Sequence, residues 1–141
     1  DVSREFGVLP NEVIPALYQS ISAGVPEQNV AEFLRVAAAA AKVGITDLET
    51  AVDGITSVTN AWGHEVISAT EASDLMFTAV RLGKTDFNQM SKEIYKVGPL
   101  AAAVGIDFGS VTAALANQTA QGTPPAVAAT PLKSAFAEFA K

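Results

Sequence analysis

The stretch that decides the fold spans residues 44–63, GITDLETAVDGITSVTNAWG, and it has the marks of one complete helix. Thr46 suits the N-cap position, and Glu49 three residues later can bond back to the Thr46 amide in a capping box. Gly63 permits the left-handed backbone that ends many helices. Between these ends, apolar residues recur at steps of three and four and define one face that must be buried: Leu48, Ala51, Val52, Ile55, Thr59 and Trp62.

The residues before this stretch predict two further helices. The first opens at Leu9-Pro10-Asn11 and ends at Gly24, with Pro15 expected in its first turn, where a proline is tolerated. The second spans residues 29–43. Its alanine run, residues 37–41, has two interpretations: an efficient helix former, or a narrow face that lets a neighbouring helix approach closely.

The residues after it repeat the same pattern of caps and glycine stops. Ser68 and Glu71 predict a second capping box, for a helix that ends at Gly83. Thr85 is expected to cap the next helix, and Gly98-Pro99 is expected to break it, which leaves a short piece over residues 99–104.

The C-terminal third predicts two more starts. Asp107 is expected to cap a helix that Gly122 closes. Thr123-Pro124 and Thr130-Pro131 each suggest an N-cap followed by proline at the first helical position, where the missing amide costs nothing. The last helix then carries Leu132, Ala135, Phe136 and Phe139 on one side.

No segment alternates as a half-buried strand does, so the sequence predicts an all-α fold. We expect residues 1–141 to form a single helical domain, a compact array of about seven to eight short helices arranged as degenerate helical hairpins. A chain of 141 residues is long enough for this, because it buries about two thirds of its unfolded surface.

Glycines mark a repeat. Gly7, Gly44, Gly83 and Gly105 each precede a helix start, and a second set follows them at Gly24, Gly63, Gly98 and Gly122. The expected unit is a helical hairpin with start-to-start steps of 37 and 39 residues and a shortened third copy of 22. Because no known helical-repeat signature is present, we expect a degenerate pseudo-repeat rather than a solenoid.

Composition narrows the function classes. Nine basic against fifteen acidic residues give a net charge of −6, and no cluster of Lys and Arg is present, which argues against binding nucleic acid. The absence of cysteine removes disulfide and thiolate chemistry. Charged residues are only 17%, so the surface is expected to be unusually neutral. The longest uncharged apolar segment, residues 97–106, is too short for a membrane helix, and the first residues suggest an internal fragment of a longer polypeptide.

No residue stands out as catalytic, cofactor-binding or metal-binding. A single histidine, His64, is expected to be an exposed turn residue. Glu49 and Asp53 share a helix face, as a pair of acid and base carboxylates would, but helix capping accounts for acids early in a helix. The charged trio Lys92, Glu93 and Lys96 suggests a solvated face, and Trp62 and Phe108 lie on apolar stripes typical of core packing rather than ligand stacking.

Several segments taken together resemble the core region of tail tape measure proteins of long-tailed bacteriophages and prophages. They are YQSISAGVP at residues 18–26, the alanine-rich helix leading into GITDLETAVDGITSVTNAWG, and the succession from ATEASDLMFTAV at residue 69 to ATPLKSAF at residue 136. The resemblance covers nearly the whole chain, and it depends on the order and spacing of these segments rather than on any catalytic signature.

The resemblance implies a structural, non-enzymatic protein of the virion tail, in the tube lumen or at the tail tip, assembled in the host cytoplasm. It implies roles in tail assembly, length determination and genome delivery. The implied partners are the tail tube protein, tail assembly chaperones, tail-tip or baseplate proteins, and further copies of the protein itself through self-association.

Size refines this expectation. A compact domain of this length has a radius of gyration of about 14 Å, so several copies would not fit abreast in a tail tube. We therefore expect a docking or assembly domain that unfolds to enter the tube, rather than the measuring part. The alternative from the residues alone is a generic helical-hairpin interaction module of a cellular protein, binding a partner helix in a groove.

Overall fold

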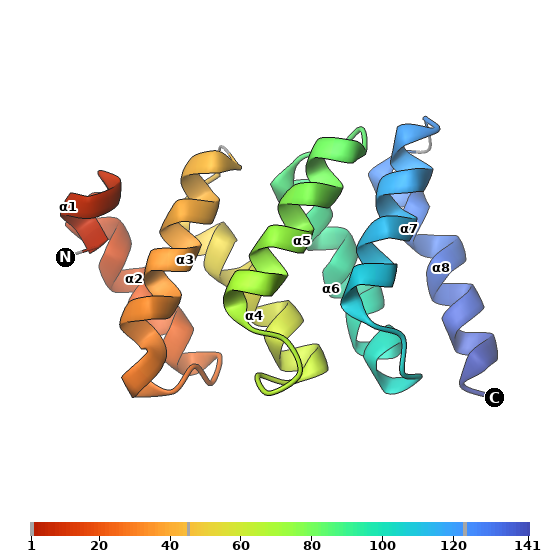
Figure 1. Ribbon diagram of the computed structural model, residues 1–141, viewed down its shortest axis with the longest axis horizontal. Helices are drawn as coiled ribbons and strands as arrows, with labels where there is room; N and C mark the ends of the chain where they lie inside the picture. Colours follow the sequence, from red (N-terminus) through yellow and green to blue (C-terminus); the bar gives the residue numbers. More distant parts are fainter. Residues whose placement is uncertain (1, 45, 123) are drawn as a thin grey trace.

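The computed structural model describes residues 2–44, 46–122 and 124–141, and within these ranges it contains helices and no strand (Figure 1). The prediction of an all-α fold is confirmed. The helices are α1 (Val2–Phe6), α2 (Pro10–Ser22), α3 (Val30–Val43) after a short 3-10 turn at Glu27–Asn29, α4 (Leu48–Trp62), α5 (Ala69–Leu82), α6 (Phe87–Ala103), α7 (Phe108–Ala120) and α8 (Pro125–Phe139).

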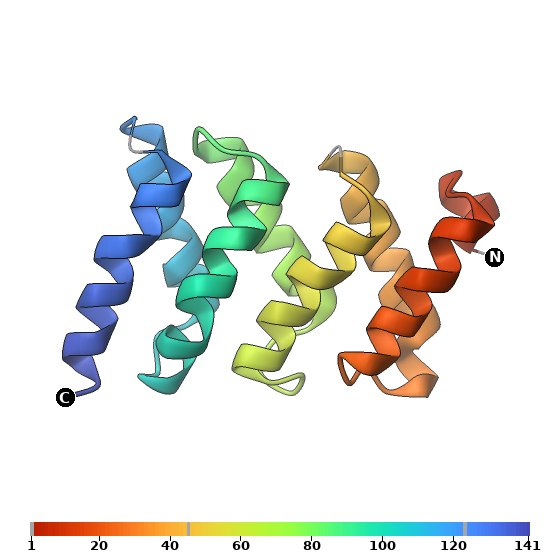
Figure 2. The ribbon, with the colours of Figure 1, turned by 180° about the vertical axis from the view of Figure 1, so that it is seen from behind.

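The helices form two layers. The odd-numbered helices α1, α3, α5 and α7 make one layer, and the even-numbered helices α2, α4, α6 and α8 make the other (Figures 1 and 2). Each helix packs against the next one along the chain and against the one two further on, in its own layer. The two ends of the chain lie at opposite ends of the array. This is the arrangement of stacked helical repeats, in which a unit contacts only its neighbours.

The repeat is more regular than the glycine pattern predicts. Helices of the even layer begin at Pro10, Leu48, Phe87 and Pro125, at steps of 38, 39 and 38 residues. Helices α3, α5 and α7 begin at steps of 39. The shortened third unit is therefore wrong. Gly105 lies in the turn inside the third unit, and it shares a positive φ with Gly24 and Gly63 in the corresponding turns.

The predicted break at Gly98-Pro99 is also wrong, since α6 continues to Ala103. Pro99 is exposed, so the carbonyl that loses its amide partner lies on the solvent side of the helix. Gly98 is buried for a packing reason: a Cβ there would lie 3.2 Å from Cζ3 of Trp62. This glycine permits a close approach between α4 and α6 and does not end a helix.

Two other proline predictions need correction. Pro131 lies inside α8, which begins at Pro125, so Thr130-Pro131 is not a helix start. Pro15 lies in the second turn of α2 rather than the first. Both prolines are exposed, on sides of their helices where no neighbour needs the missing amide. The predicted N-cap Thr123 lies outside the described residues.

Aspartates cap two of the helices that we assigned to threonine. The Asp47 carboxylate accepts from the Thr50 amide at 2.7 Å, and Asp86 does the same from Gln89 at 2.8 Å. Both helices therefore start one residue later than predicted, and the Thr46–Glu49 capping box does not form. The predicted caps at Ser68–Glu71 and at Asp107 are confirmed.

The core lies between the two layers, and many of its positions are small or hydroxylated. Four alanines of the run in α3 are buried, which supports the close-approach interpretation: Ala37, Ala38, Ala40 and Ala41. Buried hydroxyls donate to carbonyls one turn earlier in their own helix, as Ser20 does to Ala16 at 2.7 Å and Ser91 to Phe87 at 2.8 Å. The layers are thus held together mainly by apolar packing.

Candidate partner-binding pocket

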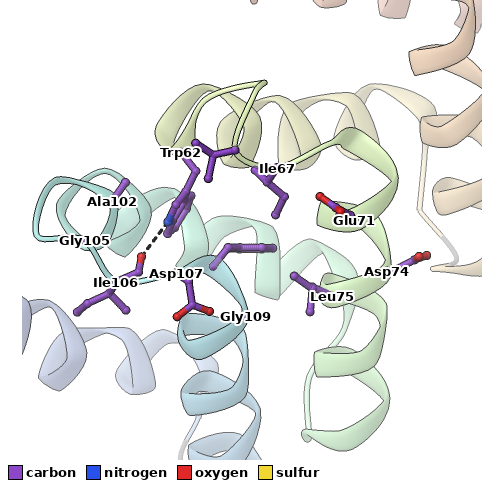
Figure 3. Close-up of a pocket in the computed structure, with 12 residues that line it drawn as sticks. Trp62, Ile67, Glu71, Asp74, Leu75, Ala102, Gly105, Ile106, Asp107 and Gly109 are labelled. Atoms are coloured by element: carbon purple, nitrogen blue, oxygen red, sulfur yellow. Dashed lines mark hydrogen bonds between the residues drawn. The ribbon is translucent and has the colours of Figure 1, made fainter.

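A pocket of about 680 Å³ opens where the α4–α5 turn meets the α6–α7 turn (Figure 3). Two successive repeats contribute to it, because the residues come from the end of α4, the start of α5, the end of α6 and the start of α7. Its walls are mostly apolar and its rim is acidic. The lining residues are Trp62, Val66, Ile67, Glu71, Asp74, Leu75, Ala102, Gly105, Ile106, Asp107, Phe108 and Gly109.

Trp62 is fixed at the floor of this pocket. Its indole Nε1 donates a hydrogen bond to the Ile106 carbonyl at 2.8 Å, across 44 residues of sequence. The Trp62 and Phe108 rings lie with centroids 5.1 Å apart and planes tilted by 59°, a favourable aromatic geometry. Phe108 is buried, whereas Trp62 is partly exposed. The predicted packing role is confirmed for both, and Trp62 in addition lines a surface that a ligand can reach.

Three carboxylates stand around these apolar walls. Glu71 and Asp74 come from α5 and Asp107 from the residue before α7 (Figure 3). Glu71 accepts from the Ser68 amide, and Asp107 accepts from the Ser110 hydroxyl at 2.7 Å and the Ser110 amide at 3.0 Å. These bonds, that from the hydroxyl first, lower the pKa of Asp107 below its ordinary 3.8. The described lining includes no Lys, Arg or His, so the rim is negative.

The remaining sequence candidates do not meet at one site. Glu49 and Asp53 are both exposed in a shallow groove between α4 and α6, with Lys92, Tyr95 and Lys96 on the opposite wall. Mixed charge on an open surface is typical of a solvated face and offers no dry environment for acid and base work. His64 is exposed in the α4–α5 turn, as predicted, and its Nε2 lies 3.2 Å from Oδ1 of Asn60.

Glu93 differs from the prediction. We expected it on a solvated face with Lys92 and Lys96, but its side chain is only 3% exposed. The half-exposed Lys96 ammonium lies 3.1 Å from Oε1 and bonds to both carboxylate oxygens. The periodicity of α6 contained the signal, because Glu93 lies between the buried positions Met90 and Val97 on the same side of the helix.

The described part of the chain holds no cluster of three or more histidine, aspartate or glutamate side chains placed to bind a metal. None of its helices combines the length and hydropathy of a membrane-crossing segment. Sequence reasoning therefore found Trp62 and Phe108, but it missed the acidic rim, since Asp74 and Asp107 come together only through the stacking of two repeats.

Comparison with known proteins gives consistent matches. The family model described as phage-related minor tail protein matches residues 1–141. A probable tape measure protein of Clostridium phage phiCD119 is 32% identical over 145 residues, covering all of this chain and 15% of that protein. The chain thus spans a small part of the length of that relative. No solved structure matches significantly.

Proposed function

Since the chain belongs to the phage-related minor tail protein family, we propose that it is a module of a tail tape measure protein that acts in tail assembly, length determination and genome delivery. The observation that carries this proposal is the match over the whole chain, to the family and to a probable tape measure protein. The module has a structural role and no enzymatic one. Its place is the virion tail, after assembly in the host cytoplasm.

Within that role, the module acts as a docking domain that is folded before packaging or at an end of the tail. A folded array two helices thick does not pass through a tube side by side with other copies, so the module unfolds to enter the tube. This makes it a part that is recognised rather than a part that measures. The alternative of a cellular interaction module has no support from a match that covers the whole chain with a phage tail family.

The way the layers are held together supports reversible unfolding. Buried hydroxyls bond within their own helix, so separating two helices leaves these groups satisfied. Few polar bonds join different helices; examples are the Trp62 indole on Ile106 and the Asn60 amide on the Ala23 carbonyl. Exposing apolar surface is therefore the main cost of opening the array.

The acid-rimmed pocket is the proposed docking site. An apolar floor with a negative rim fits a segment that presents an apolar side chain flanked by Lys or Arg. The proposed partners are the tail assembly chaperones, with tail-tip or baseplate proteins and the tail tube protein as later contacts. Binding is expected to weaken as salt is raised, because the rim carboxylates are exposed.

A charge reversal tests the docking site. Asp74→Lys changes an exposed rim carboxylate that takes no part in helix capping, so the fold is expected to persist. We expect this variant to bind the purified tail assembly chaperone of the same phage at least tenfold more weakly in a titration. Glu65→Lys, an exposed glutamate outside the pocket, is the matched control. Equal losses from both variants would show that only net charge matters.

A deletion tests the role of the module in the tail. Removing residues 1–141 from the phage protein is expected to reduce the number of tails and the infectivity, while the tails that form keep their wild-type length in electron micrographs. If the segment were part of the ruler in helical form, tails would shorten by roughly 210 Å at about 1.5 Å per residue. Such a proportional shortening would overturn the docking role and leave the family assignment intact.

A further inference from the structure

The N-terminal end of the array exposes a row of large apolar side chains. Ile14, Tyr18 and Ile21 lie on one stripe of α2 and are 68%, 76% and 46% exposed. In the even layer α2 is the outermost helix, with α4 on its inner side (Figure 2). Ala16, on the inner side, is completely buried. The row therefore faces away from the rest of the array.

The repeat identifies what this row corresponds to. Helices α2 and α4 start 38 residues apart, so Ile14, Tyr18 and Ile21 are equivalent to Val52, Thr56 and Thr59 of α4. Those three are 0%, 4% and 1% exposed. At 100° per residue they lie on the side of α4 opposite Gly54, and Gly54 abuts Ser91 of α6. They thus face α2, and the row on α2 is the same stacking face without a neighbour.

The other end of the even layer has the complementary face. Helix α8 begins 38 residues after α6, so Pro131, Ala135 and Phe139 are equivalent to Glu93, Val97 and Ala101. The α6 residues are buried, whereas the three on α8 are exposed, Phe139 by 73%. Inside the array the leading side of a helix carries small residues, Ala16 on α2 and Gly54 on α4. Ala135 continues this, opposite the bulky row of α2.

We propose that copies of this chain stack end to end, with the leading side of α8 in one copy packed on the Ile14–Tyr18–Ile21 row of the next. The two layers stay in register across such a junction. The even layer continues from α8 to α2, and the odd layer from α7 to the short α1, which already packs beside α3. Because the two surfaces differ, the contact is heterologous and leaves one free face at each end. This inference is independent of the proposed docking pocket.

Sedimentation of the purified 141-residue chain tests the proposal. We expect the mass to rise with protein concentration beyond that of a dimer, from a monomer of 14.6 kDa. Tyr18→Glu blocks one face and Ala135→Glu blocks the other, so each variant alone is expected to stay monomeric. Mixed in equal amounts, the two variants still share one intact pair of faces, and they are expected to form a dimer and no larger species.

Tyr95→Glu is the matched control. Tyr95 has the same position in the repeat as Tyr18 and is 68% exposed, but it lies on the interior helix α6. Its substitution is expected to leave association unchanged, and circular dichroism checks that every variant is folded. Two results would overturn the proposal. One is a wild-type chain that stays monomeric at all concentrations, as expected if additional sequence of a longer protein covers the row. The other is a dimer that Tyr18→Glu abolishes and Ala135→Glu does not affect, which indicates symmetric pairing of α2 with α2.

Discussion

Helices α2 and α4 occupy equivalent positions in the repeat, yet their surroundings differ sharply. Val52 on α4 is fully buried, whereas its counterpart Ile14 on α2 is 68% exposed. Both helices are amphipathic and both begin a unit. The difference comes from neighbours: α4 has a helix on each side within its layer, and α2 has one on its inner side only. In such an array, stability belongs to the contacts between units more than to the units themselves.

The largest expected effect contrasts the interior with the end. Ile55→Ala removes a fully buried side chain from α4 and is expected to lower the free energy of unfolding by about 2–5 kcal/mol. Ile14→Ala, at the exposed end, is expected to change it by less than about 0.5 kcal/mol. Urea denaturation of the two variants measures both. Comparable losses would show that the exposed row is packed in solution.

Overpacking gives the next effect. A Cβ at position 54 would lie 2.5 Å from Oγ of Ser91, so Gly54→Ala is expected to cost about 1–3 kcal/mol despite the better helix propensity of alanine. The double variant with Ser91→Ala removes the closest atom and is expected to recover part of the loss. If the two changes proved additive in a double-mutant cycle, α4 and α6 would not approach as closely as described.

The buried ion pair gives a smaller effect. Lys96→Met leaves the Glu93 carboxylate buried without its partner and is expected to cost about 1–2 kcal/mol, since the lysine is half exposed and the pair is partly screened by solvent. Lys92→Met, a neighbouring exposed lysine, is the control and is expected to be nearly neutral. Thermal unfolding compares them. A neutral Lys96→Met variant would mean that water solvates Glu93.

The smallest expected effect is a pH dependence at the pocket rim. Because the folded state lowers the pKa of Asp107 below 3.8, its carboxylate contributes stability at neutral pH. That contribution is lost as the pH falls through the folded pKa. The advantage of the wild type over Asp107→Asn is therefore expected at pH 7 and is expected to vanish on strong acidification. Urea midpoints at the two pH values measure it; an advantage that persists in acid would assign it to hydrogen bonding alone.

Local signals account for most of the fold. Caps at Ser68 and Asp107, glycines after the helices and the three-to-four periodicity predict the helices within a few residues. In the Thr-Asp pairs, the aspartate rather than the threonine caps, and the sequence rules rank both residue types as good caps. Competition of this kind between adjacent residues shifts a boundary by one position without altering the helix.

The errors come where packing decides. Gly98 and Pro99 form a strong local break signal, yet the helix continues because the glycine admits Trp62 and the proline faces solvent. Misplacing that break also misplaced the third repeat. The pocket rim and the exposed row on α2 required the stacking of units, since Asp74 and Asp107, or Tyr18 and Val52, are related only through the array.

The near-constant step of 38 or 39 residues between helices of the same layer has an evolutionary consequence. Gain or loss of one whole unit would keep every remaining junction of the same kind, whereas a change of a few residues would put two layers out of phase. Arrays of this type are therefore expected to vary among phages in quanta of one hairpin.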